Sequence, residues 1–189
     1  DSTLNSAFDK RTLPARLSLS DGERGCSASH AAIWRMLAAM PLDAPPVVVL
    51  EDDVVLSDGF ARSCAHIALA ASSRHAPEDR LMLCYLGADV AEWRDRAPKL
   101  RTAAVADGEM VALCEAKYLW QTSSYLIWPA AARFLVGDMP IDAPVDCFLS
   151  RHVLQGRLTA LVAQPQLAWQ AKPYQDGDVL HTNLFKSRV

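Results

Sequence analysis

The run VVVL at residues 47–50 is apolar at every position and is followed directly by three carboxylates. Strands covered on both faces carry such uninterrupted β-branched runs, whereas strands with one exposed face alternate apolar and polar residues. A strand of this kind needs helices on both sides of its sheet, and the segments before and after it have helical spacing. The sequence therefore predicts an α/β protein of three layers with a mostly parallel central sheet.

Start and stop signals along the chain predict helices and strands in alternation. Ser20 and Glu23 form a capping-box pattern before the first helix, and Ser57 and Asp142 are the expected N-caps of two later helices. The expected helices cover 21–40, 57–74, 129–136 and 142–156, and the expected strands cover 47–56, 81–89, 123–128 and 158–169. We expect one domain over 1–189, with an irregular lead at 1–18, a surface loop at 90–111 and an irregular tail at 171–189.

Composition narrows the range of functions. The 189 residues are 51% apolar with a formal net charge of -3, which suits one globular domain and argues against binding of nucleic acid through its phosphates. The apolar runs fall short of the roughly 18 to 20 residues that cross a bilayer, so no transmembrane segment is expected. The five cysteines show no CxxC or Cys/His zinc spacing, so a cytoplasmic location is expected, with peripheral contact at the inner membrane left open. Nothing in the sequence indicates the oligomeric state.

The acids Glu51, Asp52 and Asp53 are the strongest candidates for a functional site. In an extended strand Glu51 and Asp53 project to one side and Asp52 to the other. Neighbouring anions raise one another's pKa unless a cation offsets them, and carboxylate oxygens suit Mg²⁺ or Mn²⁺, which bridge protein carboxylates to substrate phosphates. The motif therefore predicts a metal-diphosphate site, with the alternative that the strand ends at Leu50 and the acids cap a turn.

Five blocks of the sequence resemble, in order and spacing, glycosyltransferase family 25, which includes bacterial lipooligosaccharide galactosyltransferases and collagen galactosyltransferase domains. The blocks are GERGCSASHAAIW, VVVLEDDVVLSDGF, YLGAD, TSSYLIWPAAARFL and PVDCFLSR, within a match over about residues 19–178. The resemblance implies a GT-A fold, which is Rossmann-like and binds nucleotide sugars, and inverting transfer of galactose or glucose from a UDP-sugar. It also implies that Glu51, Asp52 and Asp53 bind Mn²⁺ and the donor diphosphate.

The same resemblance makes residues of the first helix candidates for donor binding. The family's GCxxSH block matches Gly25, Cys26, Ser29 and His30, which implies a role for Ser29 and His30 in cofactor or donor binding. A hydrogen-bonded core histidine is the alternative for His30, because it shares a helical stripe with apolar residues. Cys26 on that stripe is expected to pack as a small hydrophobe.

Asp146 is the first candidate for a catalytic base. It stands in the family's PVDxFL block, and an inverting transferase needs a carboxylate to take the proton from the acceptor hydroxyl. Asp142 is the second candidate. For Asp146, capping of a helix N-terminus is the alternative explanation.

Further candidates lie in the two segments expected to be irregular. The segment WQAKPYQDGDVLHT resembles the family's closing block at Gln170 and Asp178. His181 is a candidate metal ligand because many GT-A enzymes use a late histidine, with an exposed tail histidine as the alternative. Candidate contacts to UDP or to an anionic acceptor, with a solvated loop face as the alternative, are Arg94, Arg96, Lys99 and Arg101.

Two departures from the family pattern bear on function. Members begin with a strand of the kind VINLxRxxxR, and residues 1–16 contain no such segment. This raises the alternative that the sheet lacks its first strand and part of the uridine site. The block usually written GTxAY is QTSSY at 121–125, which leaves donor and acceptor selectivity open.

The leading hypothesis is an inverting, metal-dependent hexosyltransferase that uses Mn²⁺ or Mg²⁺. It would move a hexose from UDP to a hydroxyl of a glycan acceptor, with a bacterial lipopolysaccharide or lipooligosaccharide core as the expected acceptor. One alternative is a transferase-derived domain without catalysis that binds sugar or is structural. A lesser alternative is a metal-dependent phosphohydrolase, but its strand-end Asp-x-Asp pattern fails at Glu51 and Val55.

Overall fold

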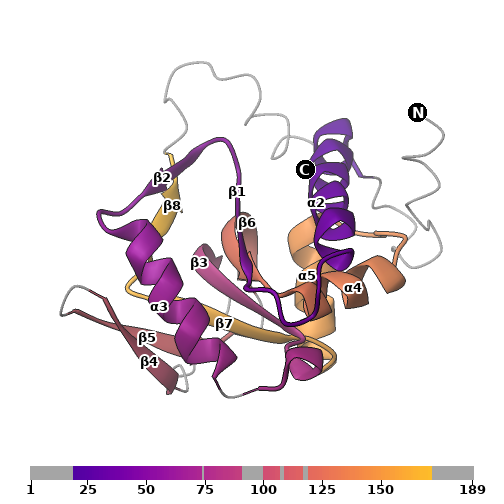
Figure 1. Cartoon of the computed structure of the whole chain (residues 1–189). Coiled ribbons are helices and arrows are strands. Elements are labelled where there is room, and N and C mark those ends of the chain that lie inside the picture. Colours follow the sequence, from indigo (N-terminus) through magenta and orange to yellow (C-terminus); the bar gives the residue numbers. More distant parts are fainter. Residues whose placement is uncertain (1–18, 74, 91–99, 107–108, 117–118, 172–189) are drawn as a thin grey trace.

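The computed structural model describes residues 19–73, 75–90, 100–106, 109–116 and 119–171. Figure 1 shows helices on both sides of a central sheet. The helices are α2 (Asp21–Ala38), α3 (Phe60–Ser72), α4 (Pro129–Gly137) and α5 (Val145–Leu154), with a short 3-10 helix at Pro77–Asp79. The strands are β1 (Val47–Leu50), β2 (Val54–Leu56), β3 (Met82–Val90), β4 (Leu100–Ala106), β5 (Glu109–Glu115), β6 (Leu119–Ile127), β7 (Thr159–Gln164) and β8 (Ala168–Gln170).

The central sheet is mixed in direction. Its strand order is β1-β6-β3-β7-β5-β4, and β2 pairs with β8 in a separate two-stranded sheet. Among the described pairs, β3 and β7 are parallel, while β1–β6, β3–β6, β5–β7, β4–β5 and β2–β8 are antiparallel. The α/β class is confirmed, but the pairing differs from the expected mostly parallel sheet. In the described part of residues 82–127 no helix separates β3, β4, β5 and β6, whereas parallel neighbours need a long crossover connection, usually a helix.

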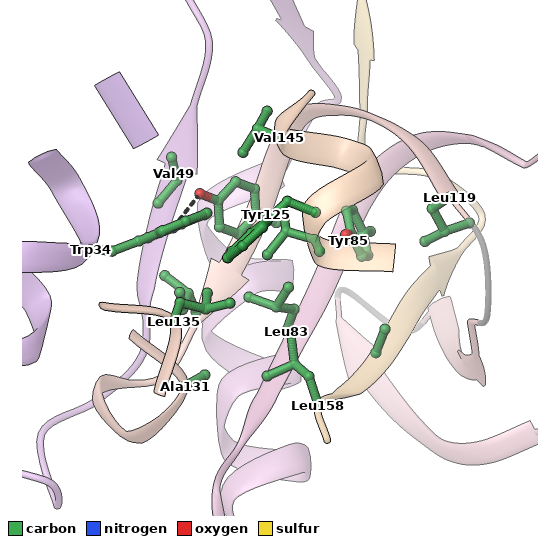
Figure 2. Packing of buried hydrophobic residues seen from close by; sticks show 14 of the residues in the cluster. Trp34, Val49, Leu83, Tyr85, Leu119, Tyr125, Ala131, Leu135, Val145 and Leu158 are labelled. Carbon is green, nitrogen blue, oxygen red and sulfur yellow. Dashed lines mark hydrogen bonds between the residues drawn. The ribbon is translucent and has the colours of Figure 1, made fainter. Parts of the chain in front are cut away.

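The two faces of the sheet bury two separate cores, which confirms the three layers. Along β3, Leu83 and Tyr85 pack on the side of α2, α4 and α5. Met82, Cys84 and Leu86 alternate with them and pack on the side of α3. Figure 2 shows part of the first core, in which side chains from helices and strands meet at the sheet.

Helix α2 begins as the sequence predicts. The Ser20 hydroxyl accepts a hydrogen bond from the Glu23 backbone N–H at 3.2 Å, and the Glu23 carboxylate accepts one from the Ser20 backbone N–H at 2.9 Å. Both halves of the capping box are therefore present. The helix ends at Ala38, shortly before Pro41, and buries His30 and Trp34 on its inner face.

The other two expected N-caps are wrong. Helix α3 has Gly59 as its N-cap, with a φ of 68°, rather than Ser57. Helix α5 has Pro144 as its N-cap, because the Asp142 carboxylate is taken up by an ion pair with Arg151 instead of the helix N-terminus.

Three further expectations about strands are corrected. The run 47–56 is two strands in two different sheets, and the chain turns at residues 52–53 between them. The run 158–169 is likewise divided, into β7 and β8, around a cis peptide bond before Pro165. The segment 90–111, expected as a surface loop, contains β4 and the start of β5, which form an antiparallel hairpin. Among the described helices, none has the length and hydropathy needed to span a membrane.

Candidate functional site

The three acids lie where β1 leaves the central sheet. The Glu51 backbone N–H still donates to the Ser123 carbonyl of β6 at 2.9 Å, and the turn at Asp52 and Asp53 then leads into β2. We call Glu51, Asp52 and Asp53 the acidic turn. Asp52 is exposed, whereas Glu51 and Asp53 are partly buried. Because the chain turns here, the simple alternation of an extended strand does not govern how the three side chains point.

Glu51 is held by side chains from two other elements. Its Oε1 accepts a hydrogen bond from the Thr122 hydroxyl of β6 at 2.8 Å and lies 3.3 Å from His30 Nε2 and 3.9 Å from Cys26 Sγ of α2. Burial alone would raise the pKa of the Glu51 carboxyl, but the hydrogen bonds from His30 and Thr122 outweigh burial and lower the pKa below its usual value. Glu51 is therefore a fixed, ionised carboxylate at neutral pH.

His30 is buried and engaged at both ring nitrogens. Its Nδ1 lies 2.7 Å from the Tyr125 hydroxyl, which also accepts a hydrogen bond from Trp34 Nε1–H at 3.1 Å; Figure 2 shows the contact between Trp34 and Tyr125. Because Trp34 can only donate and the Glu51 carboxylate can only accept, Tyr125 accepts from Trp34 and His30 Nε2–H donates to Glu51. His30 thus has the buried, bonded character of a core histidine, yet its partner is the first acid of the acidic turn.

Cys26 faces the same carboxylate. Burial, followed by the charges of Glu51 and Asp146, raises the pKa of the Cys26 thiol to about 12. The thiol is therefore protonated at neutral pH and is a poor nucleophile.

The two candidate bases differ in their surroundings. Asp146 is partly buried in the first turn of α5, where its Oδ1 accepts a hydrogen bond from the Cys147 backbone N–H at 2.7 Å. Its charge acts on Cys26 and, after burial, raises the pKa of Tyr85, so it lies within electrostatic reach of the Glu51 cluster. Asp142 is buried and forms two hydrogen bonds with the Arg151 guanidinium, at 2.8 and 2.6 Å. That pairing stabilises ionised Asp142 and makes it the weaker of the two as a base.

Asp53 is hydrogen-bonded to Gln170 and Ala171, the last two residues that the structure describes. Its Oδ2 accepts a hydrogen bond from Gln170 Nε2 at 2.5 Å, and its backbone carbonyl accepts one from Ala171 N–H at 2.7 Å. Asp52 and Asp53 together offer carboxylate oxygens, the ligands that Mn²⁺ and Mg²⁺ prefer, so the residues fit such a cation. The Glu51 Oε1 accepts hydrogen bonds from Thr122 and His30, and its role as a ligand of this cation stays a prediction.

Ser29 and Arg101 are the remaining sequence candidates within the described residues. Ser29 is exposed, and its hydroxyl donates within its own helix to the Gly25 carbonyl at 3.1 Å. Arg101 lies in β4. The candidates that fall outside the described residues are Arg94, Arg96, Lys99, Asp178 and His181.

Sequence reasoning missed three side chains of the site, namely Thr122, Tyr125 and Trp34. A signal was present, since Thr122 and Tyr125 stand at the Thr and Tyr of the GTxAY pattern and Trp34 closes the first block. Gln121, at the Gly of that pattern, has a φ of 72°, the left-handed region that favours glycine. The backbone thus keeps a glycine-like conformation immediately before Thr122.

Comparisons with known proteins identify the family of this chain. A family model described as "Glycosyltransferase family 25 (LPS biosynthesis protein)" matches residues 3–149. The chain belongs to glycosyltransferase family 25.

Several animal proteins are similar in sequence to part of this chain. A protein of Bos taurus named "Probable inactive glycosyltransferase 25 family member 3" is 32% identical over 133 residues, which is 69% of this chain and 20% of that protein. The "Inactive glycosyltransferase 25 family member 3" of Mus musculus matches with the same identity and shares. A "Glycosyltransferase 25 family member" of Aedes aegypti is 29% identical over 158 residues, 80% of this chain and 24% of that protein. The chain thus spans a fifth to a quarter of these relatives, and since they are animal proteins, a bacterial source stays a prediction.

Proposed function

We propose that this chain carries the donor site of an inverting, metal-dependent glycosyltransferase. The donor would be a UDP-sugar, with galactose or glucose as the hexose. The acceptor would be a hydroxyl of a glycan such as a lipopolysaccharide or lipooligosaccharide core.

The observation that supports this proposal most is the set of residues around Glu51. Glu51 from the acidic turn, His30 from the GCxxSH block, and Thr122 and Tyr125 from the QTSSY block come from three distant parts of the chain and join one hydrogen-bonded cluster. The cluster fixes the start of the acidic turn, while Gln170 and Ala171 fix Asp53 at its end. Asp53 is thereby fixed where β1 leaves the sheet, next in the chain to the exposed carboxylate of Asp52.

In this mechanism Asp52 and Asp53 hold the cation beside the donor diphosphate. When bound, Mn²⁺ or Mg²⁺ offsets the charge that develops on the UDP leaving group. Asp146 takes the proton from the acceptor hydroxyl as its oxygen attacks the anomeric carbon from the face opposite UDP. A bond from the acceptor oxygen to the anomeric carbon forms, and the bond from that carbon to the phosphate oxygen breaks.

The test is turnover of UDP-galactose and UDP-glucose with Mn²⁺, measured as UDP release by wild type, Asp53→Ala and Asp58→Ala. Asp58 is an exposed acid just beyond β2 and serves as the matched control. We expect Asp53→Ala to lose roughly 10²–10³-fold in turnover, as happens when one stabiliser of transition-state charge is removed. Asp58→Ala should stay within about twofold of wild type. Full activity of a folded Asp53→Ala protein would overturn the proposal.

A second candidate is a domain that binds UDP-sugar without catalysis. The names of the Bos taurus and Mus musculus relatives, which call those proteins inactive or probably inactive, favour it. The two candidates are separated by measuring UDP binding and UDP release on the wild-type chain. Binding of UDP with Mn²⁺, but no release of UDP from UDP-galactose or UDP-glucose with acceptor glycans present, would support this candidate over the transferase.

A further inference from the structure

Cys26, His30 and Glu51 bring three different metal-binding groups together. Cys26 and His30 are four residues apart on α2, so they lie on one face of the helix, one turn from each other. The Cys26 Sγ, a ring nitrogen of His30 and a carboxylate oxygen of Glu51 all lie within 4.8 Å of one another. The third ligand comes from a distant segment, which is why the spacing of cysteines and histidines along the sequence gave no sign of this set.

The two separations measured from Glu51 Oε1 are close to those around a tetrahedral zinc ion, and the Cys26 Sγ and the His30 nitrogen lie within 4.8 Å of each other. Zinc bonds of about 2.0 to 2.3 Å at tetrahedral angles place ligand atoms roughly 3.3 to 3.6 Å apart. His30 Nε2 lies 3.3 Å from Glu51 Oε1, and Cys26 Sγ lies 3.9 Å from the same oxygen. The first separation fits, and the second needs a shift of only about 0.3 to 0.4 Å. Three protein ligands leave a fourth position for water or another group.

Hydrogen-bond partners already orient two of the three ligands. The Tyr125 hydroxyl lies 2.7 Å from His30 Nδ1, and the Thr122 hydroxyl donates to Glu51 at 2.8 Å. A histidine that binds metal through one ring nitrogen usually has its other nitrogen hydrogen-bonded in this way, which fixes the ring. Trp34 fixes Tyr125 in turn, at 3.1 Å.

The Cys26 thiol lies among negatively charged carboxylates. After burial, the charges of Glu51 and Asp146 are the largest causes that raise the pKa of Cys26. A divalent cation bound to the sulfur would favour the thiolate instead of the thiol, because a coordinated thiol gives up its proton. The same negative charges that oppose a free thiolate would therefore favour a bound divalent ion.

We propose that Cys26, His30 and Glu51 bind Zn²⁺, at a site distinct from the Mn²⁺ or Mg²⁺ ligands Asp52 and Asp53. A thiolate and an imidazole select zinc, whereas the oxygen-only pair selects Mn²⁺ or Mg²⁺. On binding, the Cys26 thiol releases its proton to solvent. In the zinc-bound state His30 binds the ion through Nε2 and carries its proton on Nδ1, which donates to the Tyr125 oxygen, while the Tyr125 hydroxyl proton points away from Nδ1. This site does not depend on the proposed transferase activity.

The test uses the whole chain after removal of metals with a chelator, under reducing conditions. Co²⁺ is titrated as a spectroscopic substitute for zinc, and Zn²⁺ is then used to displace it. We expect a charge-transfer band from thiolate to Co²⁺ that saturates at one ion per chain, and loss of that band when Zn²⁺ is added. Absence of the band in wild type would overturn the proposal.

Variants assign the ligands. Cys26→Ser should lose the band and weaken Zn²⁺ binding by more than the roughly 10–100-fold expected for Tyr125→Phe, which removes only the hydrogen-bond partner of a ligand. His30→Gln and Glu51→Gln should also weaken binding, and circular dichroism without metal checks that each variant folds. Cys147→Ser, which changes another partly buried cysteine without a disulfide bond, should keep the band, as should Asp53→Asn. Loss of the band in either control, or its retention in Cys26→Ser, would contradict the assignment.

Discussion

Among individual residues, His152 is notable as a fully buried histidine. Its ring packs against the edges of Phe134 and Phe148, with centroids 5.2 and 4.7 Å apart, and Nε2 lies 3.3 Å from Asp138 without hydrogen-bond geometry. Burial, more than the opposing charge of Asp138, lowers the pKa of His152.

A lowered pKa makes the stability of the protein depend on pH near neutrality. The unfolded chain takes up a proton near pH 6.5 that folded His152 accepts only at lower pH, so the unfolded state binds more protons in this window. The free energy of unfolding should therefore fall as the pH drops below about 6.5. Denaturant titrations between about pH 7.5 and 5.5 should show this loss in wild type and a smaller loss in His152→Phe.

Exposed His75 offers a matched control, because His75→Gln should leave the pH dependence of wild type unchanged. Equal pH dependence in wild type and in His152→Phe would contradict the assignment to His152.

Residue types alone predicted part of the site. Glu51, Asp53 and His30 stand out in the sequence because carboxylates after an apolar strand and a histidine on an apolar stripe both need a physical reason. Thr122 and Tyr125 do not stand out, since a hydroxyl on a buried strand has many explanations. They reach Glu51 and His30 only because β6 lies next to β1, and no local pattern reveals that neighbour.

At the scale of elements, the capping box should stabilise α2 and the site residues that the helix carries. Ser20→Ala removes the hydroxyl that accepts from Glu23 N–H. We expect the free energy of unfolding to fall by about 1 kcal/mol. Chemical denaturation with circular dichroism measures this change.

Ser29→Ala is the comparison within the same helix. Ser29 is exposed and its hydroxyl donates to the Gly25 carbonyl of its own helix, so its replacement should leave stability unchanged or raise it slightly. If Ser20→Ala and Ser29→Ala had the same effect, the capping box would not contribute to stability.

The elements that sequence reasoning placed best are those with local signals. The start of α2 and the position of α4 follow from a capping box and from Pro129, both readable within a few residues. The β4–β5 hairpin was missed although Asp107 and Gly108 form a dipeptide typical of hairpin loops. The division of 47–56 into β1 and β2 depends on pairing with β6 and β8, which local pattern does not encode.

The packing of the two sheets against each other depends on Gly87. Gly87 lies in β3 of the central sheet and contacts β8 of the two-stranded sheet. A Cβ added there would lie 1.9 Å from the carbonyl oxygen and 2.7 Å from the carbonyl carbon of Ala168 in β8. Leu167 N–H also donates to the Leu86 carbonyl at 2.7 Å, so β8 cannot move away without breaking contacts. Gly87→Ala should therefore lower the free energy of unfolding by about 1–3 kcal/mol or more.

Gly137→Ala is the matched control, since nothing lies within 4 Å of a Cβ added at that position. Thermal and denaturant unfolding should show it close to wild type. An equal, small effect of the two substitutions would mean that the two sheets do not pack as closely as described.

The proposed donor site requires that the acidic turn bind the diphosphate of UDP through a divalent cation. Calorimetry of UDP binding to the whole chain, with and without Mn²⁺, compares wild type, Asp53→Ala and Asp58→Ala. We expect UDP to bind wild type and Asp58→Ala only when Mn²⁺ is present, and we expect Asp53→Ala to lose this binding while it stays folded. Absence of UDP binding by folded wild type with Mn²⁺, or binding that is unchanged in Asp53→Ala, would contradict the proposed donor site.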